Sequence, residues 1–171
     1  HIVGDNLLAD DYYGQDAWRN IADESWCIRL FAITGIDSQL TRRMAETKIG
    51  ETREFLKANT DLDKAAVLVH AIAMLHVVDT VGYSQEIEEF QEELTKLSES
   101  PDVFGNTLML ANILEVLART GYKGDMDGIY REIASRQEPD GRWLPSSGSG
   151  QGQVFTTFRA ILALNKYQEI A

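Results

Sequence analysis

The sequence predicts an all-α fold in which helical hairpins follow one another to form an α/α toroid-like arc, a partial α/α barrel. Apolar residues recur at steps of three or four, as in Leu68, Ile72 and Leu75, which is the spacing of one helix face. Similar hairpin sequences recur at an offset of 39 residues. Alternation of β-branched and polar residues is absent, so almost no sheet is expected.

The internal repeat pairs residues 78–83 with residues 117–122, each ending in Gly-Tyr. Each copy consists of an apolar helix, the Gly-Tyr stop and an amphipathic helix. Gly82 and Gly121 are therefore predicted to end helices in the left-handed conformation that glycine adopts at little cost. A looser third copy covers residues 26–35 and is followed by a helix over about 38–58.

The two helices of each hairpin differ in character. Residues 65–78 and 108–117 are apolar nearly all round, which predicts buried helices. The helix after residue 83 carries one charged face, made of Glu86, Glu88, Glu89, Glu92 and Glu93. An apolar helix inside and a charged helix outside is typical of a two-layered barrel or solenoid.

The C-terminal part reads Gln137-Glu138-Pro139-Asp140-Gly141-Arg142-Trp143, then a Gly/Ser loop over residues 144–152 and an apolar helix over 156–164. This pattern resembles the QW-type repeat of the terpene cyclase and protein prenyltransferase superfamily. The resemblance extends over most of residues 26–167 and implies an α/α toroid with a pocket for an isoprenoid.

The length sets the domain organisation. At 39 residues per hairpin, 171 residues hold about four hairpins, fewer than a closed toroid of this type requires. Residues 1–171 are therefore expected to form a single α/α-repeat domain that is an open arc. Such an arc would be a fragment, one domain of a longer protein, or a ring closed by a partner.

The resemblance points to Asp61 and Asp63 as candidate catalytic residues, because class II cyclases protonate their substrate with a DxDD motif. The sequence here is Asp61-Leu62-Asp63-Lys64, and Lys64 would favour ionised carboxylates over a proton donor. The alternative is structural: Thr60 caps a helix and Asp63 completes a capping pair. Asp102, before the next apolar helix, is explained in the same way as an N-cap.

Metal-binding motifs are incomplete. Class I cyclases hold magnesium with DDxxD, whereas Asp10-Asp11-Tyr12-Tyr13-Gly14 ends in glycine. The zinc candidates Cys27, His70 and His76 do not face one site, because the histidines lie about 240° apart around a helix. No cofactor is identified, and magnesium is expected only if a diphosphate ligand is bound.

Aromatic residues are the candidate substrate-binding groups. Trp26, Phe31, Trp143 and Phe155 could line a cavity and stabilise carbocations by cation–π contacts. The alternative is that they are ordinary core residues, with Trp143 stapling the turn to its neighbouring hairpin.

Charge and cysteine content bear on partners and location. The formal charge of −11 repels nucleic acid and anionic lipid, and argues against a diphosphate site, which would need local Arg or Lys. The single cysteine, Cys27, is expected to be a buried thiol and suits a reducing cytosol. No apolar run is long enough to span a bilayer, so a cytoplasmic location without a membrane span is expected.

Two functions remain open. The first is a terpene cyclase-like domain that binds or shapes a pocket for an isoprenoid, with its class II catalytic motif degenerate or absent. If active, it would be an isomerase or lyase of the cyclase type. The second is a non-catalytic α/α-repeat scaffold that binds a protein partner.

Overall fold

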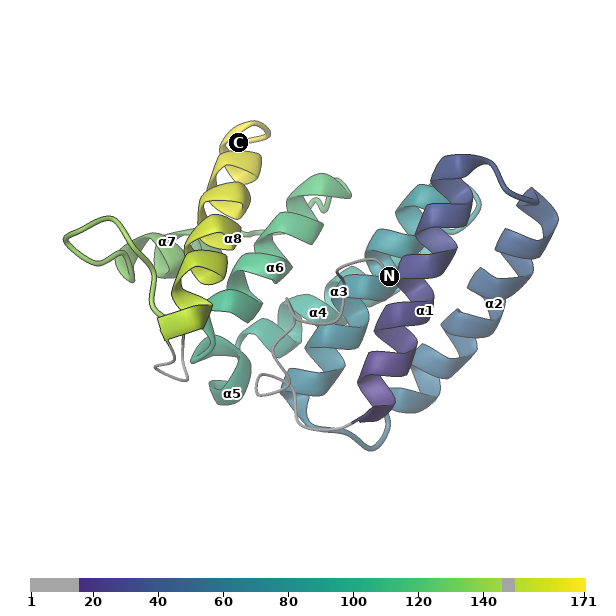
Figure 1. Ribbon diagram of the computed structural model, residues 1–171, viewed down its shortest axis with the longest axis horizontal. Coiled ribbons are helices and arrows are strands. Elements are labelled where there is room, and N and C mark those ends of the chain that lie inside the picture. The colour runs from purple at the N-terminus through teal and green to yellow at the C-terminus, as the bar shows by residue number, and fades with distance from the viewer. Residues whose placement is uncertain (1–15, 146–149) are drawn as a thin grey trace.

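A computed structural model describes residues 16–145 and 150–171, and every regular element in these ranges is a helix (Figure 1). The all-α prediction is therefore confirmed for the part of the chain that is described. None of these helices is both long and apolar enough to cross a bilayer. The helices are α1 (Asp16–Thr34), α2 (Ser38–Phe55), α3 (Asp61–Asp79), α4 (Ser84–Ser98), α5 (Pro101–Phe104), α6 (Thr107–Arg119), α7 (Asp127–Ser135) and α8 (Gly150–Gln168).

The helices alternate between two rows. Helices α1, α3, α6 and α8 form the first row, since α1 packs on α3, α3 on α6 and α6 on α8. Each of α2, α4 and α7 contacts the two first-row helices that flank it in sequence. Figure 1 shows α1 and α2 at one end of the molecule and α7 and α8 at the other.

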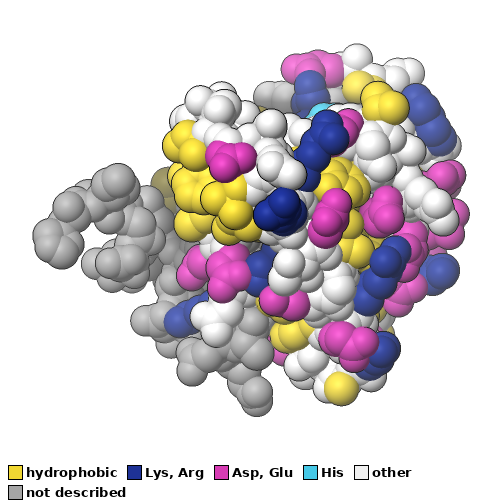
Figure 2. Space-filling model, turned by 90° about the vertical axis from the view of Figure 1, so that its right-hand side faces the viewer, with side chains coloured by type: hydrophobic (Ala, Val, Ile, Leu, Met, Phe, Trp, Pro, Cys, Tyr) yellow, Lys and Arg dark blue, Asp and Glu magenta, His cyan; other side chains and the backbone are white. Residues whose placement is uncertain are grey.

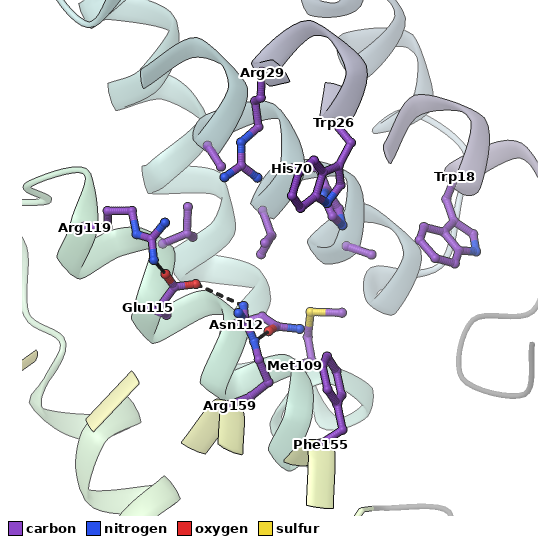
Figure 3. A pocket seen from close by; sticks show the side chains of 14 residues that line it. Trp18, Trp26, Arg29, His70, Met109, Asn112, Glu115, Arg119, Phe155 and Arg159 are labelled. Carbon is purple, nitrogen blue, oxygen red and sulfur yellow. Dashed lines mark hydrogen bonds and ion pairs between the residues drawn. The ribbon is translucent and has the colours of Figure 1, made fainter. Parts of the chain in front are cut away.

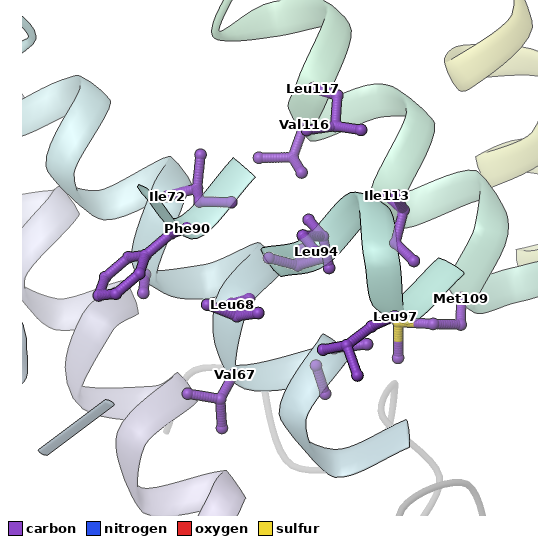
Figure 4. Packing of buried hydrophobic residues seen from close by; sticks show 14 of the residues in the cluster. Val67, Leu68, Ile72, Phe90, Leu94, Leu97, Met109, Ile113, Val116 and Leu117 are labelled. Atoms are coloured by element: carbon purple, nitrogen blue, oxygen red, sulfur yellow. The ribbon is translucent and has the colours of Figure 1, made fainter. Parts of the chain in front are cut away.

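The core lies where α3, α4 and α6 meet (Figure 4). Helix α3 is buried over almost its whole length because helices cover it on several sides, as its apolar sequence predicts. Helix α4 buries one face and exposes Glu88, Glu89 and Glu92, so the predicted amphipathic pattern is confirmed. Side chains with no exposed surface fill the junction: Leu68, Ile72, Phe90, Leu94, Ile113 and Leu117.

The two Gly-Tyr stops differ. Gly121 has a φ of 74°, as predicted, and the Tyr122 N–H donates to the Leu117 carbonyl at 3.0 Å. The same prediction is wrong for Gly82, which does not adopt a positive φ. There the Asp79 carboxylate accepts the Gly82 N–H at 2.9 Å, and a Cβ on residue 82 would lie 2.6 Å from that carboxylate. A side chain on residue 82 would therefore require the Asp79 carboxylate to move.

The turn that resembles the QW-type repeat is closed by its own side chains. The Gln137 side-chain amide donates to the Gly141 carbonyl at 3.0 Å, and Gly141 has a φ of 86°. The Trp143 ring is buried, and its Nε1–H donates to the Ile133 carbonyl at 2.6 Å. Gln137 shapes the turn, and Trp143 attaches it to α7.

Three local predictions are corrected. Asp102 lies inside α5, and Asn106 caps α6 instead, because its Oδ1 accepts the Met109 N–H at 3.0 Å. Helix α8 begins at Gly150, so residues 150–152 of the predicted loop are helical, while residues 146–149 lie outside the described ranges. Cys27 is exposed and not buried, because α1 is an end helix that packs mainly on α2 and α3.

The contrast between two glycines gives a test of the hairpin stop. Replacing Gly121 by alanine should destabilise the protein by about 1 kcal/mol, because a Cβ is strained at positive φ although nothing lies within 4 Å. Gly128 in α7 also has open space but an ordinary φ, so Gly128→Ala should stabilise by about 0.5 kcal/mol. Urea unfolding followed by circular dichroism measures both, and equal effects would contradict the assignment of Gly121.

Candidate ligand-binding pocket

A pocket of about 420 Å³ lies among the four first-row helices, α1, α3, α6 and α8 (Figure 3). Ala66, Val69, His70 and Ala73 of α3 form part of its wall. The remaining walls bring together side chains that are far apart in the sequence. Its volume is in the range of small-molecule sites.

One side of the pocket is cationic. Arg29 of α1, Arg119 of α6 and Arg159 of α8 all line it, and among the described residues the only carboxylate in the lining is Glu115 of α6. Arg159 Nη2 lies 3.0 Å from Glu115 Oε2, and Arg119 pairs with the other carboxylate oxygen. Arg159 Nε also donates to Asn112 Oδ1 at 2.6 Å. Two guanidinium groups therefore pair with one carboxylate that is only 7% exposed, and a third, that of Arg29, lines the same pocket.

Arg29 is held in place without a carboxylate of its own. Its guanidinium carbon lies 5.0 Å from the centroid of the Trp26 ring, a cation–π stack within one helix. Burial, followed by the nearby positive charge of Arg119, lowers the Arg29 pKa. Its Nε is buried and has no hydrogen-bond acceptor among the described residues. Buried N–H groups normally have an acceptor, so this Nε–H is an unsatisfied donor beside the pocket.

His70 adds a neutral polar group to the same wall. Burial lowers its pKa to about 4, and the positive charges of Arg29 and Arg159 act in the same direction. At neutral pH the imidazole is uncharged and offers one donor and one acceptor. It can therefore orient a ligand without adding charge.

The other side of the pocket is apolar and aromatic. Trp18 of α1, Met109 of α6 and Phe155 of α8 line it, away from Arg119 and Glu115 in Figure 3. Trp18 is 2% exposed, so it forms a fixed wall. The pocket thus has one end suited to an anion and one end suited to a hydrocarbon or an aromatic group.

The predicted aromatic residues fall in three places. Trp26 and Phe155 line the pocket, with Trp26 also 47% exposed at its edge. Phe31 is half-buried on α1 and is not part of the lining. Trp143 is in the hydrophobic core, where the staple alternative places it.

The candidate acids Asp61 and Asp63 lie at the start of α3 and do not line the pocket. Asp61 Oδ1 is 3.7 Å from Lys64 Nζ. The Asp63 N–H donates to Thr60 Oγ1 at 3.2 Å, and the Thr60 hydroxyl donates to Asp63 Oδ2 at 2.7 Å. The capping pair predicted for Thr60 and Asp63 is confirmed.

Sequence reasoning missed the arginines because the net charge of −11 argued against local positive charge, and at this pocket that argument is wrong. A usable signal was present. Arg29 follows Cys27-Ile28 and precedes Leu30-Phe31, and Arg159 lies between Phe158 and Ala160. A lone arginine within an apolar helix is costly to bury unless it has a partner. Such an arginine therefore predicts a buried polar partner or a binding site.

No protein-family model, no curated protein and no solved structure matches the chain. Within residues 16–145 and 150–171, no three histidine, cysteine or acidic side chains come together as metal ligands. The arrangement of the pocket itself is therefore the basis for a function.

The low pKa of His70 predicts a pH dependence of stability. In the unfolded chain the pKa is about 6.5, so between pH 6.5 and 4 the unfolded state binds a proton that the folded state does not. The contribution of neutral His70 to the free energy of unfolding is fully present above pH 6.5. The free energy of unfolding should fall by up to about 3 kcal/mol as the pH drops to 4. His70→Gln should lack this component. The difference between the two urea-unfolding curves at pH 7.5 and pH 4.5 measures it, and a pH-independent difference would contradict the burial of a neutral imidazole.

Proposed function

We propose that this chain is a helical-repeat domain of the α/α toroid type that binds an isoprenoid with an anionic end in the pocket between α1, α3, α6 and α8. The alternation of two helix rows supports an arc of this kind. The pocket lies on the row formed by the more apolar helices, which is where a repeat architecture presents a shared surface.

The observation that carries the proposal is the division of the pocket into a cationic and an aromatic side. Arginines bind phosphate oxygens through charge-assisted and often bidentate hydrogen bonds. Trp18, Met109 and Phe155 offer an apolar surface for a hydrocarbon chain. A prenyl diphosphate has both parts in one molecule.

The volume favours a short prenyl chain. A volume of about 420 Å³ lies in the lower part of the range of small-molecule sites. A geranyl chain with part of its headgroup is close to this size. A geranylgeranyl chain is twice as long and is expected to fit this volume less well.

We assign the pocket a binding role and no reaction step. Asp61 and Asp63 are outside the lining, and both carboxylate oxygens of Glu115 are paired with arginines, so none of these acids is placed to donate a proton to a ligand in the pocket. A cyclase-type activity would therefore require an acid from outside this pocket.

A protein partner is the second candidate, and exposed apolar stripes favour it. Along α1 the exposed residues Trp26, Leu30 and Ile33 are spaced by four and three, and along α8 so are Val154, Phe158 and Ile161. Figure 2 shows hydrophobic side chains gathered in a patch beside a face that is otherwise rich in charges. Contiguous exposed apolar surface of this kind marks interaction sites.

A thermal-shift titration with geranyl diphosphate tests the first function. At a hundredfold excess over Kd, a ligand that binds only the folded state adds about 2.7 kcal/mol, enough to raise Tm by several degrees. Geranylgeranyl diphosphate should bind more weakly. Phe155→Ala should reduce the shift, whereas Phe31→Ala, the same change outside the lining, should not.

An unchanged Tm with both diphosphates and a folded protein would contradict isoprenoid binding and leave the partner-binding scaffold as the function. A shift that Phe155→Ala does not reduce would place the ligand elsewhere.

A further inference from the structure

The three arginines of the pocket are not equivalent in the free protein. Glu115 holds Arg119 and Arg159 through its two carboxylate oxygens, whereas Arg29 has its buried Nε without an acceptor. Glu115 thus occupies the place that an anionic ligand would need in order to contact Arg119 or Arg159. The Glu115 carboxylate therefore competes with an anionic ligand for these two arginines.

We propose that Glu115 makes the pocket selective for phosphate headgroups with two or more negative charges over monoanionic carboxylates, by competing with the ligand for Arg119 and Arg159. This inference rests on the proposed function of the pocket as a binding site for an amphipathic anion. The inference specifies the charge that the ligand must carry, and it names Glu115 as the residue that sets this requirement.

The charge balance gives the reason. Among the described lining residues, three arginines and one carboxylate leave a local charge of about +2, because His70 is neutral at pH 7. A monoanion can be held by Arg29 alone, but it offers too little charge to replace a buried carboxylate at the other two arginines. A headgroup with two or more negative charges can bind Arg29 and one further arginine at once. It can therefore replace the ion pair that an arginine loses when it leaves Glu115.

The geometry allows this exchange within a small space. Arg159 is fixed by Asn112 through its Nε and by Glu115 through its Nη2, so loss of the carboxylate leaves Arg159 still positioned by Asn112. Arg29 is positioned independently by Trp26. Figure 3 shows these side chains directed toward the same space from three helices. The donors are therefore in place before the ligand arrives.

The test compares geranyl diphosphate with geranic acid, which carries a carboxylate on a similar hydrocarbon chain, in wild type and Glu115→Gln. Isothermal titration should show that the wild type binds the diphosphate at least about tenfold more tightly. In Glu115→Gln the affinity for geranic acid should rise about tenfold and the preference should shrink. Arg29→Gln should weaken both ligands by about tenfold.

A matched control removes a carboxylate elsewhere. Glu132 pairs with Arg136 at 2.8 Å and does not line the pocket, so Glu132→Gln makes the same change of net charge. Its affinities should equal those of wild type. Glu115→Asp keeps the charge but shortens the reach, so an intermediate preference is expected and provides a second readout if Glu115→Gln is poorly folded.

A Glu115→Gln or Glu115→Asp protein that is folded and binds geranic acid no better than wild type would overturn the inference while leaving the proposed function intact. Inorganic pyrophosphate separates the sources of affinity: binding comparable to geranyl diphosphate would show that a free phosphate anion is the ligand. If neither geranyl diphosphate nor geranic acid binds to the folded protein, the proposed function itself is contradicted.

Discussion

The burial of α3 is the constraint on which the rest of the structure depends. Helices α1, α2, α4, α5 and α6 all contact it, and ten of its residues are buried. An apolar helix of this kind is stable only when neighbours cover it, since most helix stability in proteins comes from packing. The positions of α1 and α6 on either side of α3 in turn bring Arg29 and Arg119 to one pocket. The site is thus a product of the core and not of a local motif.

Charge is distributed unevenly over the molecule. The chain carries an excess of eleven acidic charges, many of them on the exposed face of α4, yet its pocket has an excess of arginine. The acidic surface repels anions at long range, but salt screens that repulsion beyond about 10 Å. Inside the pocket the short-range contacts decide binding. Net charge therefore describes the surface of this protein and does not describe its site.

Features that depend on periodicity could be predicted from the sequence. Contacts between side chains of different helices could not. The buried and exposed faces of α4, the Thr60 cap and the Gly121 stop follow from local spacing, and each was predicted correctly. Gly82 and Gly121 are each followed by tyrosine, but the Asp79 side chain decides the conformation at Gly82. The convergence of arginines from α1, α6 and α8 requires knowledge of which helix faces meet, and a single sequence does not contain that information.

The stacking of Arg29 on Trp26 has a spectroscopic consequence. The chain has three tryptophans: Trp18 and Trp143 are almost fully buried, whereas Trp26 is 47% exposed and in contact with a guanidinium. Emission from the two buried indoles reports on folding. Emission and quenching at Trp26 report on the solvent and the charge at the pocket edge. The native chain therefore carries two intrinsic fluorophores in the lining of its candidate pocket, Trp18 and Trp26, and Trp143 in the core serves as an internal reference.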